Sequence, residues 1–530
     1  MKGGMMQVPL TVPSLLERAA TLFPEKVVVT VTEEGRARLA WREVRDRAWA
    51  LAAALPSLGV GEGDRVASLA WNSHRHLELY FGVPAAGAVL LTANVRLSTE
   101  QVTRILAHAG ARVVFADPEF VPLVDEAARS LPFQPRKVVL DARAPDGWSA
   151  YEDILASADP SAGRPDLDED AAAGLCYTSG TTGEPKGVLY SHRAIALHTL
   201  AICLPDGFGL GEADVVLPAV PMFHANAWGL AHAAAMTGAT LVLPGARPSV
   251  ERLAALLEEE RVTFAAGVPT VWMGVLDELR RRPRALSPRL RIHSGGAPTA
   301  PALLEAYRSE LGVEILAGWG MTELTPVGLV CHPRGEMAAW SPEALLPVRT
   351  AQGTPLPFVE VRLTDDEGRP VLADGKTPGE LEVRGPWVTA GYFLAPGGEA
   401  FRDGWFRTGD VATQDERGYV RLVDRTKDLI RSGGEWISSV QLEHALMDHP
   451  AVAEVAVVAV PDDRWGERPV ACVVLRPGGG ATPQELLASM TGRFPKWWIP
   501  DRVVFLEAVP RTSTGKYDKR TLRWRLRNDG

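Results

Sequence analysis

The sequence predicts an α/β protein with a large N-terminal domain and a small C-terminal α+β domain, and three patterns support this. Short apolar segments alternate with amphipathic helical segments up to about residue 350, as is typical of a largely parallel sheet. Residues 350–423 change to short alternating segments between Gly, Pro and Asp turns, which indicates a small β-barrel. Compact helix and strand patterns follow residue 424. We therefore expect a large domain over 1–423, a hinge over 424–428 and a small domain over 429–530.

The large domain is expected to hold two doubly wound α/β subdomains, because the helix–strand rhythm occurs twice. Residues 14–55 have a helix–strand–helix pattern, with Ser14 as the predicted N-cap. The expected elements that follow are a strand at 65–71, a helix at 74–82 and strands at 113–115 and 137–140. After residue 188 come strands at 215–217 and 240–243, a helix at 250–260 and strands at 264–266 and 290–293. The small domain is expected to contain helices at 438–447 and 482–494 and strands at 452–460, 469–475 and 502–505.

Composition excludes several classes of protein. The net charge of −9 argues against a nucleic-acid partner. The four cysteines form no C-x-x-C pair, which argues against a metal cluster or a disulfide framework and favours a reducing, cytoplasmic compartment. Residues 215–246 carry no Asp, Glu, Lys or Arg, but their prolines, their glycines and Asn226 would break a membrane-spanning helix. The first twenty residues lack the uninterrupted apolar region of a signal peptide.

The stretch YTSGTTGEPKG at residues 177–187 has the composition of a polyphosphate-binding loop. Glycines let backbone N–H groups approach an anion, and hydroxyls and a lysine add donors and charge. The spacing differs from G-x-x-x-x-G-K-[ST], so this is not the common P-loop, and a kinase, which would form ADP, is disfavoured. The residues expected to bind phosphate are Thr178, Ser179, Gly180, Thr181, Thr182, Gly183 and Lys186.

This stretch resembles the phosphate-loop signature of the adenylate-forming superfamily, which includes acyl-CoA synthetases, luciferases and peptide-synthetase adenylation domains. Further motifs extend the resemblance over nearly the whole chain. The stretch PMFHANAW at residues 221–228 is similar to the form found in fatty acyl-CoA synthetases. The resemblance implies that His224 lies beside the reacting carboxylate and that Trp228 gates an acyl tunnel. A tunnel suits the uncharged segment around it, because each buried methylene of a fatty acid contributes about 0.8 kcal/mol.

The stretches SGGAP at 294–298 and GWGMTE at 318–323 resemble the family's adenine and α-phosphate motifs. The family usually has tyrosine where this chain has Trp319, a change that keeps stacking on adenine but loses the phenol. The resemblance implies that Thr322 contacts the α-phosphate and that Glu323 and Thr178 bind Mg²⁺ through oxygen ligands. The nucleotide-binding residues implied here are Gly296, Ala297, Gly318, Trp319, Gly320 and Thr322, with Gly320 also next to the acyl substrate.

The remaining motifs resemble the ribose, hinge and catalytic-lysine elements. In FRTGD, Asp410 would accept hydrogen bonds from the ribose hydroxyls. In DRTKDL, Arg425 would contact the ribose and Lys427 would be the pivot of a mobile C-terminal domain. In PRTSTGK, Lys516 would neutralise charge that develops during adenylation. The residues implied to line the CoA channel are Arg431, Ser432, Gly433, Gly434 and Glu435.

The sequence therefore predicts ATP-dependent activation of a medium- or long-chain fatty acid through acyl-AMP, followed by transfer to CoA. His224, Glu323, Lys427 and Lys516 are the predicted catalytic residues. An adenylating ligase for an aryl or short-chain acid, or for a carrier-protein thiol, is an alternative. A non-catalytic acyl- or nucleotide-binding protein is a remote one. The resemblance also implies a homodimer, and it is compatible with peripheral membrane contact.

Overall fold

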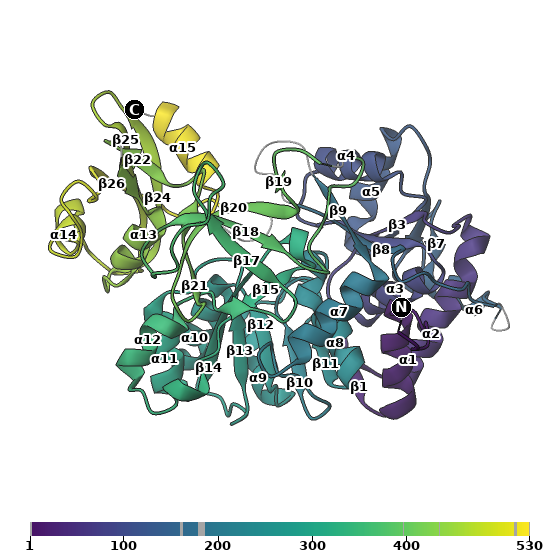
Figure 1. Cartoon of the computed structure of the whole chain (residues 1–530). Helices are drawn as coiled ribbons and strands as arrows, with labels where there is room; N and C mark the ends of the chain where they lie inside the picture. The colour runs from purple at the N-terminus through teal and green to yellow at the C-terminus, as the bar shows by residue number, and fades with distance from the viewer. Residues whose placement is uncertain are drawn as a thin grey trace.

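The structure is a computed structural model that describes residues 3–159, 163–178, 186–395, 397–433, 435–512 and 517–528. A large body contains two α/β sheets and a five-stranded antiparallel sheet, and a smaller unit formed by the C-terminal part of the chain projects from it (Figure 1). Each of the two α/β sheets has helices on both faces, as the alternating pattern predicts.

The first sheet has seven strands, which are parallel except for the antiparallel edge strand β9. Two of its central strands, at residues 89–92 and 113–116, are mainly apolar and buried throughout, as expected for a parallel sheet. In spatial order the strands are β7 (Ser149–Ala150), β6 (Arg136–Val139), β5 (Val113–Ala116), β3 (Arg65–Leu69), β4 (Val89–Thr92), β8 (Ala172–Tyr177) and β9 (Gly187–Ser191). The helices of this region are α2 (Trp41–Ala54), α3 (His74–Ala85), α4 (Thr99–Ala109), α5 (Val121–Arg129) and α6 (Tyr151–Ala156).

The second sheet has nine strands, with antiparallel pairs only at its two ends. In spatial order they are β16 (Thr354–Pro355), β15 (Val327–Val330), β14 (Glu314–Gly320), β13 (Arg291–Ser294), β12 (Phe264–Gly267), β10 (Val215–Pro218), β11 (Thr240–Leu243), β1 (Val27–Thr32) and β2 (Gly35–Ala40). The helices are α1 (Val12–Leu22), α7 (His192–Cys203), α8 (Leu230–Thr237), α9 (Val250–Glu259), α10 (Pro269–Arg281), α11 (Pro301–Leu311) and α12 (Pro342–Arg349).

β1 and β2 do not lie in the sheet that their place in the sequence suggests. β1 precedes the whole first sheet in sequence, yet it pairs in parallel with β11 of the second. Its neighbouring residues Val28 and Val29 are both fully buried, and they belong to the cores on opposite faces of that sheet. A strand that is apolar on both faces is stabilised by an interior position next to a parallel strand.

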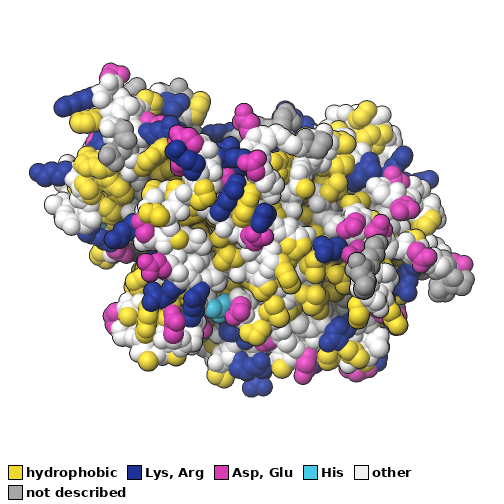
Figure 2. All heavy atoms as spheres, in the orientation of Figure 1, with side chains coloured by type: hydrophobic (Ala, Val, Ile, Leu, Met, Phe, Trp, Pro, Cys, Tyr) yellow, Lys and Arg dark blue, Asp and Glu magenta, His cyan; other side chains and the backbone are white. Residues whose placement is uncertain are grey.

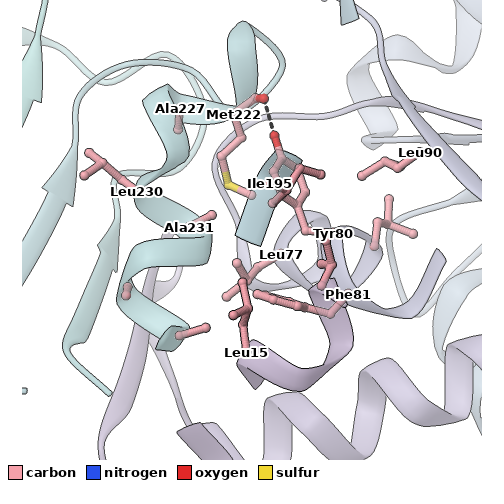
Figure 3. Packing of buried hydrophobic residues seen from close by; sticks show 14 of the residues in the cluster. Leu15, Leu77, Tyr80, Phe81, Leu90, Ile195, Met222, Ala227, Leu230 and Ala231 are labelled. Carbon is pink, nitrogen blue, oxygen red and sulfur yellow. Dashed lines mark hydrogen bonds between the residues drawn. The ribbon is translucent and has the colours of Figure 1, made fainter. Parts of the chain in front are cut away.

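The two sheets share one apolar core, which joins them into a single body. Side chains from α1, α3, α7 and α8 meet in it, as Figure 3 shows for Leu15, Leu77, Ile195 and Leu230. The hydroxyl of Tyr80 donates to the carbonyl of Met222 across this core. The segment that carries the HANAW motif is therefore held against the first sheet by packing as well as by a buried hydrogen bond.

The region predicted to be a small β-barrel is a five-stranded antiparallel sheet with its own core. Its strands are β17 (Glu360–Thr364), β18 (Gly379–Arg384), β19 (Phe401–Arg402), β20 (Trp405–Gln414) and β21 (Val420–Arg425). The long strand β20 pairs with β18, β19 and β21, so it carries the TGD motif through the centre of this sheet.

The C-terminal unit is a second α+β structure with a five-stranded sheet. Its elements are β22 (Ile430–Ser432), β23 (Glu435–Ile437), α13 (Ser439–Met447), β24 (Val452–Asp462), β25 (Gly466–Leu475), α14 (Pro483–Ala488), β26 (Arg502–Phe505) and α15 (Lys519–Asn528). Its two apolar clusters contain no residue before 430, whereas the clusters of the large body end at Leu422. The apolar cores therefore separate around residues 424–428.

Two helix boundaries differ from the sequence-based expectation. α1 begins at Val12 with Thr11 at its N-cap position, so Ser14 is not the cap, and its hydroxyl donates to the carbonyl of Thr11. Pro13 favours this earlier start because proline is tolerated in the first helical turn. α14 ends at Ala488 rather than near 494, and Gly492 follows with a positive φ of 81°. None of the helices within the described ranges combines the length and apolar character needed to cross a bilayer.

Candidate functional site

Thr178 and Lys186 lie at the base of the predicted phosphate loop, between β8 and β9. The N–H of Thr178 donates to the carbonyl of Lys186 at 2.9 Å, which extends the antiparallel pairing of these strands. Lys186 is exposed, so its ammonium is accessible to an anion. Ser179, Gly180, Thr181, Thr182 and Gly183 lie outside the described residues.

Lys186 is connected to Glu323 through the ring of Tyr392. The Lys186 ammonium lies 4.8 Å from the centre of that ring, and the Tyr392 hydroxyl donates to Glu323 Oε1 at 2.9 Å. The N–H of Phe393 donates to the carbonyl of Gly187 at 2.8 Å, which holds this segment against the phosphate loop. Burial raises the pKa of Glu323, and the Tyr392 hydrogen bond, Arg425 and Lys186 oppose that rise. A buried carboxylate is therefore brought beside the phosphate-loop cation.

Asp410, Trp319 and Arg425 form a second group. The indole Nε1–H of Trp319 donates to Asp410 Oδ2 at 2.8 Å, and Arg425 Nε lies 3.2 Å from Oδ1. Asp410 and Trp319 are buried, and the Asp410 charge is the main cause of the raised pKa of Arg425. The indole N–H thus makes a polar contact of its own at a position where the family usually has a phenol. Each carboxylate oxygen has two lone pairs, so Asp410 keeps acceptor capacity for a ligand.

Lys427 lies in the electrostatic field of the same group. Burial and the neighbouring Arg425 lower its pKa, whereas Asp428 and Asp410 raise it. The predicted pivot residue is exposed, and its side chain lies close to the predicted ribose site.

The HANAW motif forms an unusual left-handed turn, η3 (Ala225–Gly229), which follows His224. Ala225, Asn226, Ala227 and Trp228 have φ values of 43°, 53°, 48° and 57°, a conformation that costs energy for residues other than glycine. The buried Asn226 side chain helps to hold it, since its Oδ1 accepts from Tyr80 at 3.3 Å and from Cys176 at 3.4 Å. Such strain is characteristic of ligand-binding segments.

Trp228 lies against the turn that follows β13. A Cβ added at Gly295 would lie 3.5 Å from the Trp228 ring and 3.5 Å from the carbonyl of Gly318. The Trp228 ring also makes an edge contact with His293, with ring centres 5.5 Å apart. The structure therefore brings the HANAW, SGGAP and GWGMTE motifs together.

Glycine is required at two of these positions. A Cβ at Gly318 would lie 2.3 Å from His293 Cε1, and one at Gly320 would lie 2.1 Å from the carbonyl of Pro326. Gly296, with a φ of 79°, and the exposed Ala297 form the adjacent turn.

Thr322 is buried, and its carbonyl accepts from the Tyr190 hydroxyl at 2.6 Å.

The residues predicted to line the CoA channel make their described contacts within the C-terminal unit. The Arg431 guanidinium lies 4.2 Å from the Trp436 ring, and Ser432 Oγ accepts from Arg468 at 3.1 Å. The N–H of Gly433 donates to the carbonyl of Trp465 at 2.8 Å, and Glu435 pairs with Ser432 in the β22–β23 ladder. None of the contacts described for Arg431, Ser432 and Gly433 reaches the Asp410 group. Gly434 and Lys516 lie outside the described residues.

Glu323 is a carboxylate near the phosphate-loop cation that could hold a magnesium ion. The described ranges contain no group of three or more His, Cys, Asp or Glu residues arranged to hold a metal. Mg²⁺ bound to a nucleotide takes one or two carboxylates and completes its shell with phosphates and water. Glu323 beside the phosphate-loop base fits that requirement.

The sequence motifs did not identify two residues of the site. Tyr392, which joins Lys186 to Glu323, lies in an irregular segment between β18 and β19, where no pattern marked it. His293 is buried at the end of β13, and burial lowers its pKa to about 3, so it is neutral at physiological pH. Its position directly before SGGAP is the signal that would have identified it.

Comparison with known proteins identifies relatives over the full chain. Residues 16–393 match the AMP-binding enzyme family, and residues 441–516 match the AMP-binding enzyme C-terminal domain. A long-chain-fatty-acid–CoA ligase of Thermus thermophilus is 49% identical, with 99% of this chain and 97% of the relative covered. A 3-methylmercaptopropionyl-CoA ligase of Ruegeria pomeroyi is 44% identical over 100% and 99% of the two chains. A medium-chain-fatty-acid–CoA ligase of Ectopseudomonas oleovorans is 42% identical over 99% and 97%.

Solved structures match the fold over the same extent. The anthranilate CoA ligase AuaEII in complex with anthranoyl-AMP has a TM-score of 0.90 at 25% identity, with 100% of this chain and 99% of that chain covered. A fatty acyl CoA synthetase of Mycobacterium tuberculosis has a TM-score of 0.72 at 28% identity, with 98% and 99% covered.

Proposed function

Because the chain belongs to the AMP-binding enzyme family, we propose that it converts a medium- or long-chain fatty acid, ATP and CoA into acyl-CoA, AMP and pyrophosphate. The observation that carries the proposal is the juxtaposition of Asp410, Trp319 and Arg425. An aromatic residue, a ribose acceptor and a cation next to one another suit an adenosine monophosphate group. The relatives named for long- and medium-chain acids support a fatty acid as the substrate.

In the first half-reaction the carboxylate of the acid attacks the α-phosphorus of ATP, and pyrophosphate leaves. Asp410 accepts from the ribose hydroxyls, while Lys186 and the phosphate loop bind the departing phosphates. His224 and Trp228 orient the acid, and the position of the Trp228 ring beside the Gly295 turn supports this role. Lys516 balances charge on the phosphoryl oxygens. Glu323 and Thr178 would hold Mg²⁺, which supplies further charge neutralisation when it is bound.

In the second half-reaction the thiol of CoA attacks the carbonyl carbon of acyl-AMP, and AMP leaves. A thiol with a pKa of about 8.5, like that of free cysteine, needs no strong base for this step. We propose that the C-terminal unit turns about Lys427 between the steps, so that Arg431, Ser432, Gly433, Gly434 and Glu435 reach the site. The separation of the apolar cores at 424–428 supports this movement.

The competing substrate classes are aryl acids and short acids. The relative named for 3-methylmercaptopropionate and the fold neighbour named for anthranilate supply the comparison compounds. The test measures AMP and acyl-CoA formation with palmitate, octanoate, butyrate, 3-methylmercaptopropionate and anthranilate under identical conditions. We expect the highest kcat/KM with octanoate or palmitate. A higher kcat/KM with one of the other three acids, or ADP as the product, would contradict the proposal.

Location and assembly follow from the sequence and the resemblance. We propose a cytoplasmic enzyme that forms a homodimer and takes small-molecule substrates. Basic and acidic side chains are interspersed over the face seen in Figure 2, on both the large body and the C-terminal unit.

A further inference from the structure

The C-terminal unit contacts the large body around residues 424–428 through polar groups. Three contacts join a residue before the predicted pivot, Lys427, to a residue well after it. Ser438 Oγ donates to the carbonyl of Val423 at 2.5 Å. The N–H and Oγ of Ser439 donate to Asp424 Oδ2 at 2.7 and 2.5 Å.

Lys519 extends this contact into the C-terminal unit. Its ammonium donates to Ser439 Oγ at 2.7 Å and lies 2.6 Å from Glu443 Oε1. A continuous path therefore runs from Lys519 through the Ser439 hydroxyl to the Asp424 carboxylate. We call Asp424, Ser438, Ser439 and Lys519 the latch.

The latch is largely shielded from solvent. Asp424, Ser438 and Ser439 are buried, and the Lys519 side chain is 12% exposed. Burial alone would lower the pKa of Lys519, but the Glu443 and Asp424 carboxylates outweigh it and raise the pKa. Hydrogen bonds between charged groups are roughly twice as strong as neutral ones, so these few contacts can hold an orientation that the apolar cores do not.

The position of Lys519 in the chain connects the latch to catalysis. It lies three residues after Lys516. Arg523, in the same helix α15, forms an ion pair with Asp428 and donates to the carbonyl of Lys427 at 3.2 Å. The helix that follows the catalytic-lysine loop is thus tied to both ends of the 424–428 segment. In the same structure Arg431, Ser432 and Gly433 make their described contacts within the C-terminal unit, away from Asp410.

We propose that Asp424, Ser439 and Lys519 are positioning residues that hold the C-terminal unit in the orientation used for acyl-AMP formation, and that the contact between Asp424 and Ser439 must break before CoA is acylated. Asp424 belongs to β21 of the large body, whereas Ser439 and Lys519 belong to the C-terminal unit. A turn of that unit about Lys427 displaces one side of the latch from the other. This inference rests on the proposed two-step reaction.

The first test is a pair of single substitutions assayed in the two half-reactions separately. Asp424→Ala removes the acceptor on the body side but leaves Lys519 paired with Glu443. We expect acid-dependent pyrophosphate release to fall about tenfold, as for the loss of a hydrogen bond to a charged group, while thioester formation from supplied acyl-AMP is unchanged. Ser439→Ala should act in the same direction with a smaller effect.

Ser489→Ala is the matched control, because this hydroxyl donates only to the carbonyl of Leu486 inside the C-terminal unit among the described contacts, at 2.7 Å. It should leave both half-reactions unchanged. Equal losses in both half-reactions for Asp424→Ala, or no loss in the first, would overturn the proposal.

The second test closes the latch covalently. The double variant Asp424→Cys, Ser439→Cys is oxidised to join the two thiols and is compared with each single variant. Oxidation should restore pyrophosphate release relative to the reduced double variant and abolish thioester formation, and a reductant should reverse both effects. Undiminished thioester formation by the joined protein, or failure of the thiols to join, would contradict the latch. If the wild-type protein releases no pyrophosphate with any acid, the proposed function fails, but thiol joining still reports on the contact.

Discussion

The large body and the C-terminal unit are stabilised in different ways. In the body, two sheets of seven and nine strands share an apolar core that includes side chains from α1, α3, α7 and α8. The C-terminal unit has separate cores and meets the body through the latch and the Arg523–Asp428 pair. Apolar packing fixes the residues predicted to bind the nucleotide and the acyl group relative to one another, whereas a few hydrogen bonds fix the orientation of the C-terminal unit. The proposed two-step reaction at one site requires a fixed pocket and a releasable unit.

Lowering the pH should produce the largest difference in stability between the two parts, because buried neutral histidines are concentrated in the body. Burial lowers the pKa of His198, His232 and His293 to about 3 and that of His74 and His76 to about 4. These groups take up protons only when the chain unfolds, so their stabilisation is present above pH about 6.5 and is lost as the pH falls towards 4. In that window each of these histidines lowers the free energy of unfolding by about 1.4 kcal/mol per pH unit.

Calorimetry at pH 7 and pH 5 checks this prediction. The unfolding transition of the body should move to lower temperature by more than that of the C-terminal unit. Asp117 opposes the trend, because burial raises its pKa to about 7 and its contribution is lost as the pH rises. Equal shifts of both transitions would show that the buried histidines do not distinguish the two parts.

Lys516→Ala removes the catalytic group that the C-terminal unit is predicted to supply. Loss of one group that stabilises developing charge costs about 100- to 1000-fold in rate. We expect that loss in acyl-AMP formation and little change in thioester formation from supplied acyl-AMP. Rapid-quench measurement of each half-reaction decides the outcome, and equal losses in both would contradict the assignment.

Asp410→Ala removes the matching group on the body side. It takes away the predicted ribose acceptor and leaves the Arg425 guanidinium without its carboxylate partner. We expect the KM for ATP to rise about tenfold or more, because losing one partner of a charged hydrogen bond costs about 1.5–3 kcal/mol. The KM for the fatty acid should change less, and the opposite order would contradict the ribose role.

Trp319→Phe should have the smallest effect. The variant keeps an aromatic ring but loses the indole N–H that donates to Asp410 Oδ2. Loss of this hydrogen bond from a neutral donor to a carboxylate should raise the KM for ATP about fivefold. Trp319→Leu, which also loses the aromatic ring, is the paired variant. If both variants behaved alike, the indole N–H and the ring would have no separate roles.

Local patterns predicted the α/β class, most elements and the regions that converge on the site. They could not predict that β1 joins the second sheet, because Val28 and Val29 show that the strand is buried but not which strand it pairs with. They also missed Tyr392, whose role arises when an irregular segment packs against the phosphate loop. Trp319 was a predicted stacking residue, but its bond to Asp410 joins residues 91 positions apart and needs the three-dimensional structure.

The most direct test of the reaction is the fate of the carboxylate oxygens. A fatty acid labelled with ¹⁸O in both oxygens is converted with ATP and CoA, and AMP and acyl-CoA are analysed by mass spectrometry. If the carboxylate attacks the α-phosphorus and the thiol then displaces AMP, one labelled oxygen appears in AMP and the other stays in the thioester carbonyl. AMP without the label would contradict an acyl-adenylate intermediate and, with it, the division of work between the fixed body and the mobile unit.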